Sequence, residues 1–534
     1  MTIQPSQTSL HLYDTLKAAK VALQLIEPGK CGVYCCGPTV YDMSHIGHAR
    51  AALVPDMLVR VLRSEGLEVT YARNVTDIDD KIIARAAAEG ITAEAFADRY
   101  LAAYHHDLDG MAIARPDIEP KVTGHLPQII ALIEGLVARE LAYEVEGDVY
   151  YRVDRFEGYG KLSRRNLDDM RAGARVDVDT RKENPLDFAL WKATKPGEPS
   201  WPSPWGDGRP GWHIECSAMS VEHLGKSFDI HTGGRDLIFP HHENEIAQAQ
   251  GVHGDCSFAR HWIHNGFVNF AGEKMSKSIG NFFTIREVTA LYHPEVVRFF
   301  LLGVHYRSGI NFDVEVPCPS CHTPMDSAAQ DAGKCVACGH EATTQELKSQ
   351  IKFPGLEEAD DRVAYVYTTL ARAQEALSRL PESPEEAAVE LVPAIGELGQ
   401  RIRESMLDDL NSAAALAALS PALCEVNRLI DTTRGKKTKR PSFRAHLRAF
   451  VQAVARGSQL LGVFHREPAA YLQTRRDLKS QRIGLDTAKV EALLVARTEA
   501  RAAKDWAEAD NLRDQLAALG VSVQDSGDES IWTL

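Results

Sequence analysis

Short apolar runs alternate with helical periodicity through the first 300 or so residues of the chain. Gly32–Cys36 predicts a buried strand, and residues 44–62 repeat their apolar positions as a helix does. Residues 69–74 and 228–231 predict two further strands, the last running into Thr232-Gly233-Gly234. Strands separated by helices indicate a parallel, doubly wound α/β sheet. Such sheets bind ligands beyond the carboxyl ends of their strands, so functional residues are expected there.

The pattern divides the chain into four parts. Residues 1–316 are expected to form the sheet domain, with a module inserted at about 86–192. A four-cysteine insertion follows at 317–354. From Asp360 onward the pattern becomes amphipathic and alanine-rich, which predicts a helical bundle over 355–484. Residues 485–534 are expected to be a small α+β unit of two helices and a hairpin.

Composition narrows the class of protein. The 534 residues carry a formal net charge of -14, which argues against nonspecific binding of polyanions. Residues 434–440 are the strongest local basic run and are equally compatible with a nucleic-acid contact and with a solvated loop. We find no apolar run of 18 residues and no signal pattern at the N-terminus, so we expect a cytoplasmic protein without a membrane span.

Two short motifs far apart in the chain indicate a site for ATP. His45-Ile46-Gly47-His48 places two imidazoles at a tight turn that opens a helix, where phosphate oxygens can meet free backbone N–H groups. Lys274-Met275-Ser276-Lys277-Ser278 offers two lysines on a loop that can close over a triphosphate. Each motif alone is weak, and together they predict that His45, His48, Lys274 and Lys277 stabilise a reacting phosphate.

Thiols and a histidine-rich run form a candidate metal site. Cys36 and Cys216 lie far from Pro240-His241-His242-Glu243-Asn244-Glu245 in the sequence. On a helix, His241 and Glu245 at i and i+4 share a face and can bind one ion with two thiolates from elsewhere. Spacing alone does not favour His241 over His242, which stands three residues before Glu245.

A second cysteine group has the spacing of a closed zinc site. Cys318-Pro319-Ser320-Cys321 and Cys335-Val336-Ala337-Cys338 form two Cys-x-x-Cys pairs, 13 residues apart. Four thiolates would fill a tetrahedral ion and leave no open position, which is typical of a structural zinc. Few large apolar residues flank the pairs, so metal is expected to hold this segment together.

These residues closely resemble class I aminoacyl-tRNA synthetases, and among them the cysteinyl-tRNA synthetase family. The resemblance covers most of the chain, although it does not extend to the four-cysteine insertion. The matching runs are residues 34–42, 74–81, 211–217, 239–245, 274–278 and 406–411. The fold it implies is a Rossmann-like catalytic domain with an inserted connective module, followed by a tRNA-binding helical bundle and a small anticodon-binding unit.

The resemblance also implies roles for particular residues. Cys36, Cys216, His241 and Glu245 match the family's zinc ligands, so the zinc is expected to test its substrate for a thiol. Thr76 and Trp212 would orient the cysteine. Gly233, Gly234 and Asp236 would receive the adenosine of ATP, which is bound with Mg²⁺.

The implied reaction joins L-cysteine to the 3′ end of tRNA(Cys) through cysteinyl-adenylate, in a monomeric enzyme. Trp532 is expected to stack on an anticodon base. One rival is a ligase of the mycothiol type, which joins cysteine to an amino sugar but lacks a full anticodon-binding region. Another is a non-catalytic paralogue that binds tRNA or nucleotide, which we would expect to have lost the lysine motif or the zinc ligands. This chain keeps both.

Overall fold

The structure is a computed structural model that describes residues 9–166, 180–254, 256–269, 283–433, 441–526 and 529–534. Within them the central sheet has four parallel strands in the order β10-β9-β3-β4, which confirms the predicted fold class. Since β4 and β9 flank β3 on opposite sides, the carboxyl ends of β3 and β9 frame a crevice where ligands bind in such folds. The strands are β3 (Lys30–Cys35), β4 (Glu68–Arg73), β9 (Ser227–Gly234) and β10 (Phe258–Asn265).

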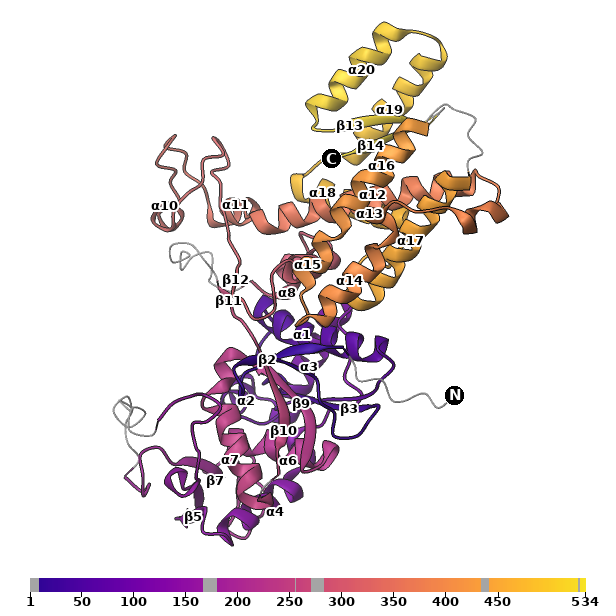
Figure 1. Ribbon diagram of the computed structural model, residues 1–534. Helices are drawn as coiled ribbons and strands as arrows, with labels where there is room; N and C mark the ends of the chain where they lie inside the picture. The colour runs from indigo at the N-terminus through magenta and orange to yellow at the C-terminus, as the bar shows by residue number, and fades with distance from the viewer. Residues whose placement is uncertain (1–8, 167–179, 255, 270–282, 434–440, 527–528) are drawn as a thin grey trace.

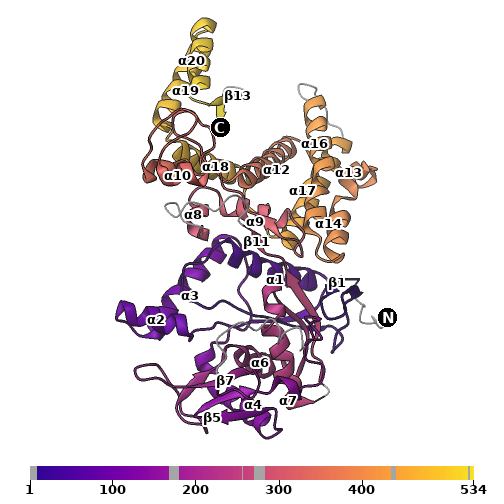
Figure 2. The same cartoon turned by 90° about the vertical axis from the view of Figure 1, so that its left-hand side faces the viewer.

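Helices cover both faces of the sheet (Figures 1 and 2). Alternate residues of β3 point to opposite faces, so Val33 joins the apolar cluster around α1 while Tyr34 joins the cluster around α6 and α7. β9 extends three residues beyond the predicted strand, so Gly233 and Gly234 lie in the strand and not after it. The helices are α1 (Ile46–Ser64), α6 (Trp212–Leu224) and α7 (His241–His253).

The segment expected as an insertion has two parts. Helices α2 (Asp80–Glu89) and α3 (Ala93–Gly110) pack in the same apolar cluster as α1, and the chain then returns along β4. The second part packs beside α6 and α7 and carries an antiparallel sheet. Its elements are α4 (Leu126–Val137), β5 (Ala142–Val145), β6 (Asp148–Tyr151), β7 (Phe188–Ala193) and β8 (Gly208–Pro210).

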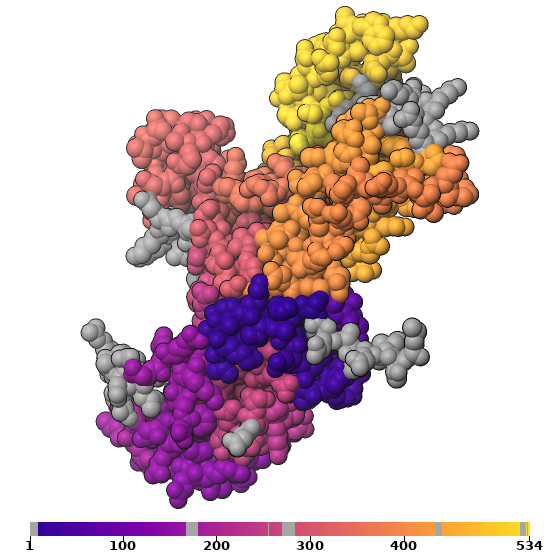
Figure 3. All heavy atoms as spheres, in the orientation of Figure 1, coloured from indigo at the N-terminus to yellow at the C-terminus, as the bar shows by residue number. Residues whose placement is uncertain are grey.

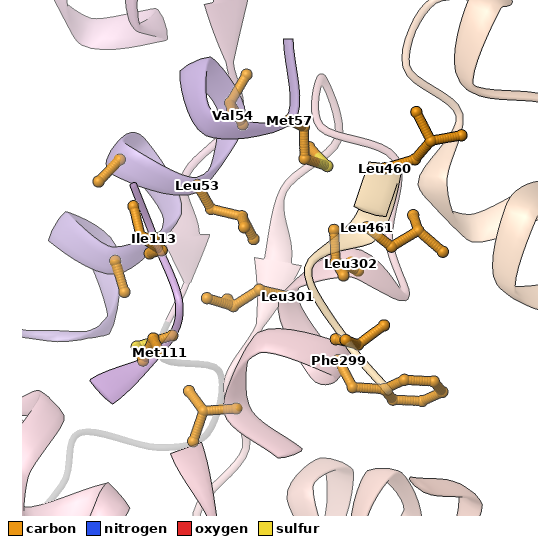
Figure 4. Packing of buried hydrophobic residues seen from close by; sticks show 14 of the residues in the cluster. Leu53, Val54, Met57, Met111, Ile113, Phe299, Leu301, Leu302, Leu460 and Leu461 are labelled. Atoms are coloured by element: carbon orange, nitrogen blue, oxygen red, sulfur yellow. The ribbon is translucent and has the colours of Figure 1, made fainter. Parts of the chain in front are cut away.

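A helical bundle, orange in Figure 3, rests on the N-terminal part of the chain beside α1 (Figures 2 and 3). The two share one apolar core, in which Leu460 and Leu461 lie near Leu53 and Met57 (Figure 4). Arg298 of α9 (Pro294–Leu302) lies buried at this joint, where its Nη2 is 2.5 Å from the carboxylate of Asp56 in α1. The bundle helices are α12 (Pro354–Ser378), α13 (Pro393–Gly396), α14 (Leu398–Leu407), α15 (Ser412–Ala417), α16 (Leu419–Thr433), α17 (Pro441–Leu461) and α18 (Pro468–Ile483).

One stretch of the bundle corrects an expectation from the sequence. Ser412–Thr432 is long and apolar enough to cross a membrane by length and composition, with a mean hydropathy of 1.3, whereas we expected no such run. In the structure Ala415, Leu419 and Val426 of this stretch are buried in the core that the bundle shares with the sheet domain. These buried residues belong to the bundle helices α15 and α16.

The C-terminal unit has the predicted two helices and hairpin, but Trp532 does not face solvent. Its side chain is 4% exposed, and its indole Nε1 donates to Glu491 Oε1 at 2.7 Å. The guanidinium of Arg476 lies over the ring, 4.7 Å from its centre. Trp532 therefore belongs to the core of the unit, and the expectation that it stacks on a base is wrong. The elements are α19 (Thr487–Ala502), α20 (Trp506–Ala518), β13 (Ser522–Ser526) and β14 (Glu529–Thr533).

Candidate active site and metal centres

The histidine motif opens α1 just beyond the end of β3. His45 is the N-cap, and its Nδ1 accepts the N–H of Gly47 at 3.0 Å, while His48 Nδ1 accepts the N–H of His45 at 3.2 Å. Burial lowers the pKa of both imidazoles, and that of His48 falls to about 4. Burial therefore favours the neutral form of both rings.

The described residues beside the lysine motif meet this turn. Thr284 pairs with His45 as a short antiparallel bridge, and the N–H of Ile285 donates to the carbonyl of Ser44 at 2.8 Å. Lys274 and Lys277 themselves lie outside the described residues. Thr284, which follows Lys277 by seven residues, therefore contacts the first motif, although the two motifs are more than 200 residues apart in the sequence.

The predicted zinc ligands come together at the carboxyl end of β3. One donor atom each from Cys36, Cys216, His241 and Glu245 lies within 4.8 Å of the others. Cys36 follows β3, Cys216 lies on α6, and the remaining two occupy the first two turns of α7. His241 Nε2 is 3.0 Å from Glu245 Oε1, as expected for positions i and i+4 on one helix face.

The electrostatics of this cluster suit a bound cation. A hydrogen bond with Cys36 lowers the pKa of Cys216 to about 6, while burial and the same hydrogen bond raise the pKa of Cys36 well above its usual range, so the pair favours one thiolate before a metal binds. Burial opposes ionisation of Glu245, but His231 and His241 outweigh it and lower its pKa to about 2. Burial would also lower the pKa of His241, yet Glu245 and Cys216 raise it to about 10. Two soft thiols, an imidazole and a carboxylate are a donor set that zinc accepts.

The structure keeps both neighbouring histidines close to the cluster. A second group, Cys36, His231, His242 and Glu245, also brings its donor atoms within 4.8 Å. His242 Nε2 is 3.3 Å from Cys36 Sγ, but its Nδ1 bonds to His264 Nε2 at 2.8 Å. The group containing Cys216 has two thiols where the other has one, and thiolates are the softer ligands for zinc.

Sequence reasoning missed two buried residues that support the cluster. His231 on β9 bonds through Nε2 to Glu245 Oε2 at 2.9 Å, and His264 on β10 lies behind His242. The signal available for His231 was a histidine inside an apolar strand, two residues before a pair of glycines. A lone histidine of that kind is more often a core residue, so the pattern did not identify a role.

The expected cysteine contacts, Thr76 and Trp212, lie beside this cluster. The Trp212 ring is 44% exposed and lies 4.4 Å from the ring of His241, centre to centre. The hydroxyl of Thr76 donates to Glu215 Oε2 at 3.0 Å. Burial raises the pKa of Glu215 well above its usual range. Thr76 is thus already held in place by Glu215, a buried residue that the sequence did not single out.

The expected adenosine contacts Gly233 and Gly234 end β9, and Asp236 lies in the turn that follows. A Cβ on Gly233 would lie 2.7 Å from His242 Cε1, and a Cβ on Gly234 would overlap the Asp236 carboxylate. Gly233 is therefore needed for packing against the buried His242 ring, whether or not nucleotide approaches it, whereas the exposed Asp236 side chain could move away from a Cβ at Gly234. His242 connects this end of the sheet to the metal cluster.

The four-cysteine insertion forms a compact ribbon that projects from the body of the molecule (Figure 1). Its two turns have the same backbone pattern. The N–H of Cys318 donates to the carbonyl five residues on and its own carbonyl accepts from the residue four on, and Cys335 repeats both bonds. The insertion also contains α10 (Ser327–Ala332) and α11 (Thr344–Ser349).

The four sulfurs of the ribbon lie within 4.8 Å of one another, and two of their separations are close to those of a tetrahedral zinc site. Cys318 Sγ lies 3.7 Å from Cys338 Sγ, and Cys321 Sγ lies 3.6 Å from Cys335 Sγ. A zinc ion with Zn–S distances of about 2.3 Å separates its sulfurs by about 3.8 Å. The apolar core of the ribbon is small and includes two of the cysteines. Its buried members are Val316, Cys318, Met325, Ala329, Cys335, Ala342 and Leu347.

Comparisons with known proteins agree with this architecture. Residues 22–317 match the family described as tRNA synthetases class I (C) catalytic domain, residues 401–465 match the DALR domain, and residues 487–532 match the cysteinyl-tRNA ligase anticodon binding domain. A methionyl-tRNA synthetase from Mycobacterium tuberculosis, solved with methionyl-adenylate, has a TM-score of 0.50 at 14% identity, covering 81% of this chain and 91% of its own. That likeness concerns the fold alone.

Curated relatives are similar over nearly the whole chain. Cysteine--tRNA ligases from Nitratidesulfovibrio vulgaris strain Hildenborough and Anaeromyxobacter dehalogenans strain 2CP-C are each 46% identical, covering 98% of this chain and 99% of their own. A third, from Pelobacter propionicus, is 46% identical and is covered completely. The insertion that the expected family pattern lacked thus lies within a match that spans full-length relatives. The chain therefore belongs to the cysteine--tRNA ligases, a family of class I aminoacyl-tRNA synthetases.

Proposed function

We propose that this chain activates L-cysteine with ATP to cysteinyl-adenylate and transfers the cysteinyl group to the 3′ end of tRNA(Cys). The observation that carries the proposal is the cluster of Cys36, Cys216, His241 and Glu245 at the carboxyl end of β3, next to the histidine turn. The matched anticodon-binding domain favours tRNA over an amino sugar as the acceptor.

The cysteine site is assigned to the zinc cluster and its neighbours. A zinc ion bound there supplies a soft Lewis acid that favours a thiolate ligand over the hydroxyl of serine. The partly exposed Trp212 ring packs against the buried His241 ring and would shield the substrate from water. Thr76, held by Glu215, would orient the amino acid within the crevice.

The ATP site is assigned to residues on both sides of this cluster. His45 and His48 accept backbone N–H groups through Nδ1, and in the neutral ring of that tautomer the proton is on Nε2, which would donate to phosphate. Lys274 and Lys277 would supply the positive charge for the leaving pyrophosphate, with Mg²⁺. Gly233, Gly234 and Asp236 would contact the adenosine.

The attacking group is the carboxylate of the bound cysteine, which forms a bond to the α-phosphorus of ATP as pyrophosphate leaves. The terminal adenosine hydroxyl of the tRNA then attacks the acyl carbon, and AMP leaves. No side chain becomes a covalent nucleophile, so orientation and charge stabilisation carry the rate.

The remaining assignments concern the rest of the chain. The bundle over 355–484 and the unit over 485–534 would bind the tRNA, and the enzyme would act as a cytoplasmic monomer. Cys318, Cys321, Cys335 and Cys338 would hold a second, structural zinc. Their sulfur spacing and the small core of the ribbon support this assignment.

Charging of purified tRNA with radiolabelled cysteine tests the proposal, with serine as the competing amino acid. We expect cysteine to be attached and serine to be refused. Cys216→Ser should lose one zinc and cysteine-dependent pyrophosphate exchange together. Cys424→Ser, an exposed thiol on α16, is the matched control and should behave as the unaltered enzyme. Full exchange by Cys216→Ser without its zinc would refute the proposed site.

A further inference from the structure

The four-cysteine ribbon leaves and rejoins the catalytic body at one point. The N–H of Glu315 donates to the carbonyl of Lys352 and the N–H of Lys352 donates to the carbonyl of Glu315, each at 2.9 Å. The 36 residues between them form a closed excursion from this antiparallel pair. We refer to Glu315 and Lys352 as the neck of the ribbon.

The neck continues directly into the metal-binding turns. The N–H of Met325 donates to the carbonyl of Val316 at 3.0 Å, and Val316 is two residues from Cys318. On the other arm, Ile351 packs against the ribbon core and also against the core of the catalytic domain. An ion that fixes the four sulfurs therefore also fixes the chain on both sides of the neck.

An aromatic group lies beneath the neck and connects it to the active site. The ring of Phe353, next to Lys352, is 4.9 Å from those of Phe312 and Phe283, centre to centre. Phe283 directly precedes Thr284, which pairs with His45. The N–H of Phe312 donates to the carbonyl of Asn269 at 2.7 Å. The described residues on either side of 270–282 thus both contact the base of the ribbon.

We propose that the metal-bound ribbon is a positioning element for the ATP side of the active site. The inference rests on the zinc proposed for Cys318, Cys321, Cys335 and Cys338 and on the ATP site proposed at His45. The ion closes the neck, and the closed neck holds Phe353 against Phe283, which keeps Thr284 paired with His45. Without the ion, closing the neck would have to overcome the entropy of a 36-residue loop, because its own core is small.

Loss of the ribbon metal should therefore weaken ATP use without touching the cysteine site. Cys338→Ser in the full chain removes one exposed sulfur, and Cys424→Ser is the control. We expect zinc to fall from two equivalents to one and the KM for ATP in pyrophosphate exchange to rise about five- to a hundredfold. The KM for cysteine should stay within twofold. When cobalt replaces zinc, the spectrum of Cys338→Ser should lack the four-thiolate absorption of the ribbon and should keep the absorption of the Cys36 cluster.

A second variant separates closing of the neck from any other effect of the ribbon. Replacing residues 316–351 by Asn-Gly joins Glu315 to Lys352 through a two-residue hairpin turn, which keeps the neck closed without metal. We expect this variant to bind one zinc and to keep the KM for ATP of the unaltered enzyme.

Three results would overturn the inference. They are Cys338→Ser with two zinc equivalents, Cys338→Ser with one zinc and an unchanged KM for ATP, and an excised variant whose KM rises as much as that of Cys338→Ser. Absence of exchange in the unaltered chain would instead refute the proposed function, so the two failures can be told apart.

Discussion

Replacement of Gly233 by alanine should disturb the metal cluster through His242. The new Cβ would lie 2.7 Å from His242 Cε1 and 3.1 Å from Leu237 Cδ1. Carbon atoms pack best at about 3.5–4.0 Å, so the imidazole would have to move by most of an ångström. It has little room, because His264 bonds to its Nδ1 at 2.8 Å and the ring of His231 lies 4.4 Å away.

The size of the effect follows from overpacking. Extra methyl groups in a tightly packed interior cost about 1–3 kcal/mol. His242 Nε2 is 3.3 Å from Cys36 Sγ, so moving the ring displaces a proposed zinc ligand. If the whole cost falls on the metal-bound state, zinc affinity should fall by a factor of about 5 to about 140, at about 1.4 kcal/mol for each factor of ten.

Competition with a chromophoric chelator measures this loss on the full chain. Gly110→Ala is the control, because a Cβ at Gly110 would meet no atom within 4 Å. The adenosine role assigned to Gly233 makes a different prediction, namely a higher KM for ATP with unchanged zinc affinity. That pattern in Gly233→Ala would refute the reasoning from His242.

Three further predictions test other parts of the molecule. Burial lowers the pKa of His48 to about 4, so between about pH 6.5 and 4 the unfolded chain binds more protons at this residue than the folded chain does. Stability should therefore fall as the pH falls through that window. Thermal melts of the enzyme should show this dependence, and it should be weaker in His48→Asn. Trp212→Ala should raise the KM for cysteine several-fold with unchanged zinc content, measured by exchange and metal analysis, whereas Trp212→Phe should restore it because stacking on His241 remains. Arg298→Ala leaves the buried Asp56 carboxylate without this partner and should lower the free energy of unfolding by about 3–5 kcal/mol, measured with denaturant. We expect a value near 3 kcal/mol, because Arg60 also pairs with Asp56. A loss below about 1 kcal/mol would contradict this account of the joint.

The sequence predicted the elements of the sheet better than the relations between them. Strand β3 and helix α1 follow from a local apolar pattern that ends in a turn, and His241 and Glu245 follow from helix geometry. No local pattern reports that His231 contacts Glu245, because that contact depends on β9 lying beside β3 in the folded sheet. Trp532 fails for a related reason. An aromatic residue near a chain end looks available, and only packing against α19 shows that it is buried.

The same side chains that shape the metal cluster also shape the proposed nucleotide site. Cys36 directly follows β3, at the start of the loop that leads to His45. His242 fills the space that Gly233 leaves open at the end of β9. A substitution that moves either residue should change the binding of both cysteine and ATP. The free-energy effects of two substitutions that both act on this centre should therefore not be additive. Trp212 contacts the metal cluster through His241, whereas the ribbon neck reaches His45 through Phe353, Phe283 and Thr284. For that reason Trp212→Ala combined with Cys338→Ser should multiply their separate effects, whereas Gly233→Ala combined with either should depart from the product.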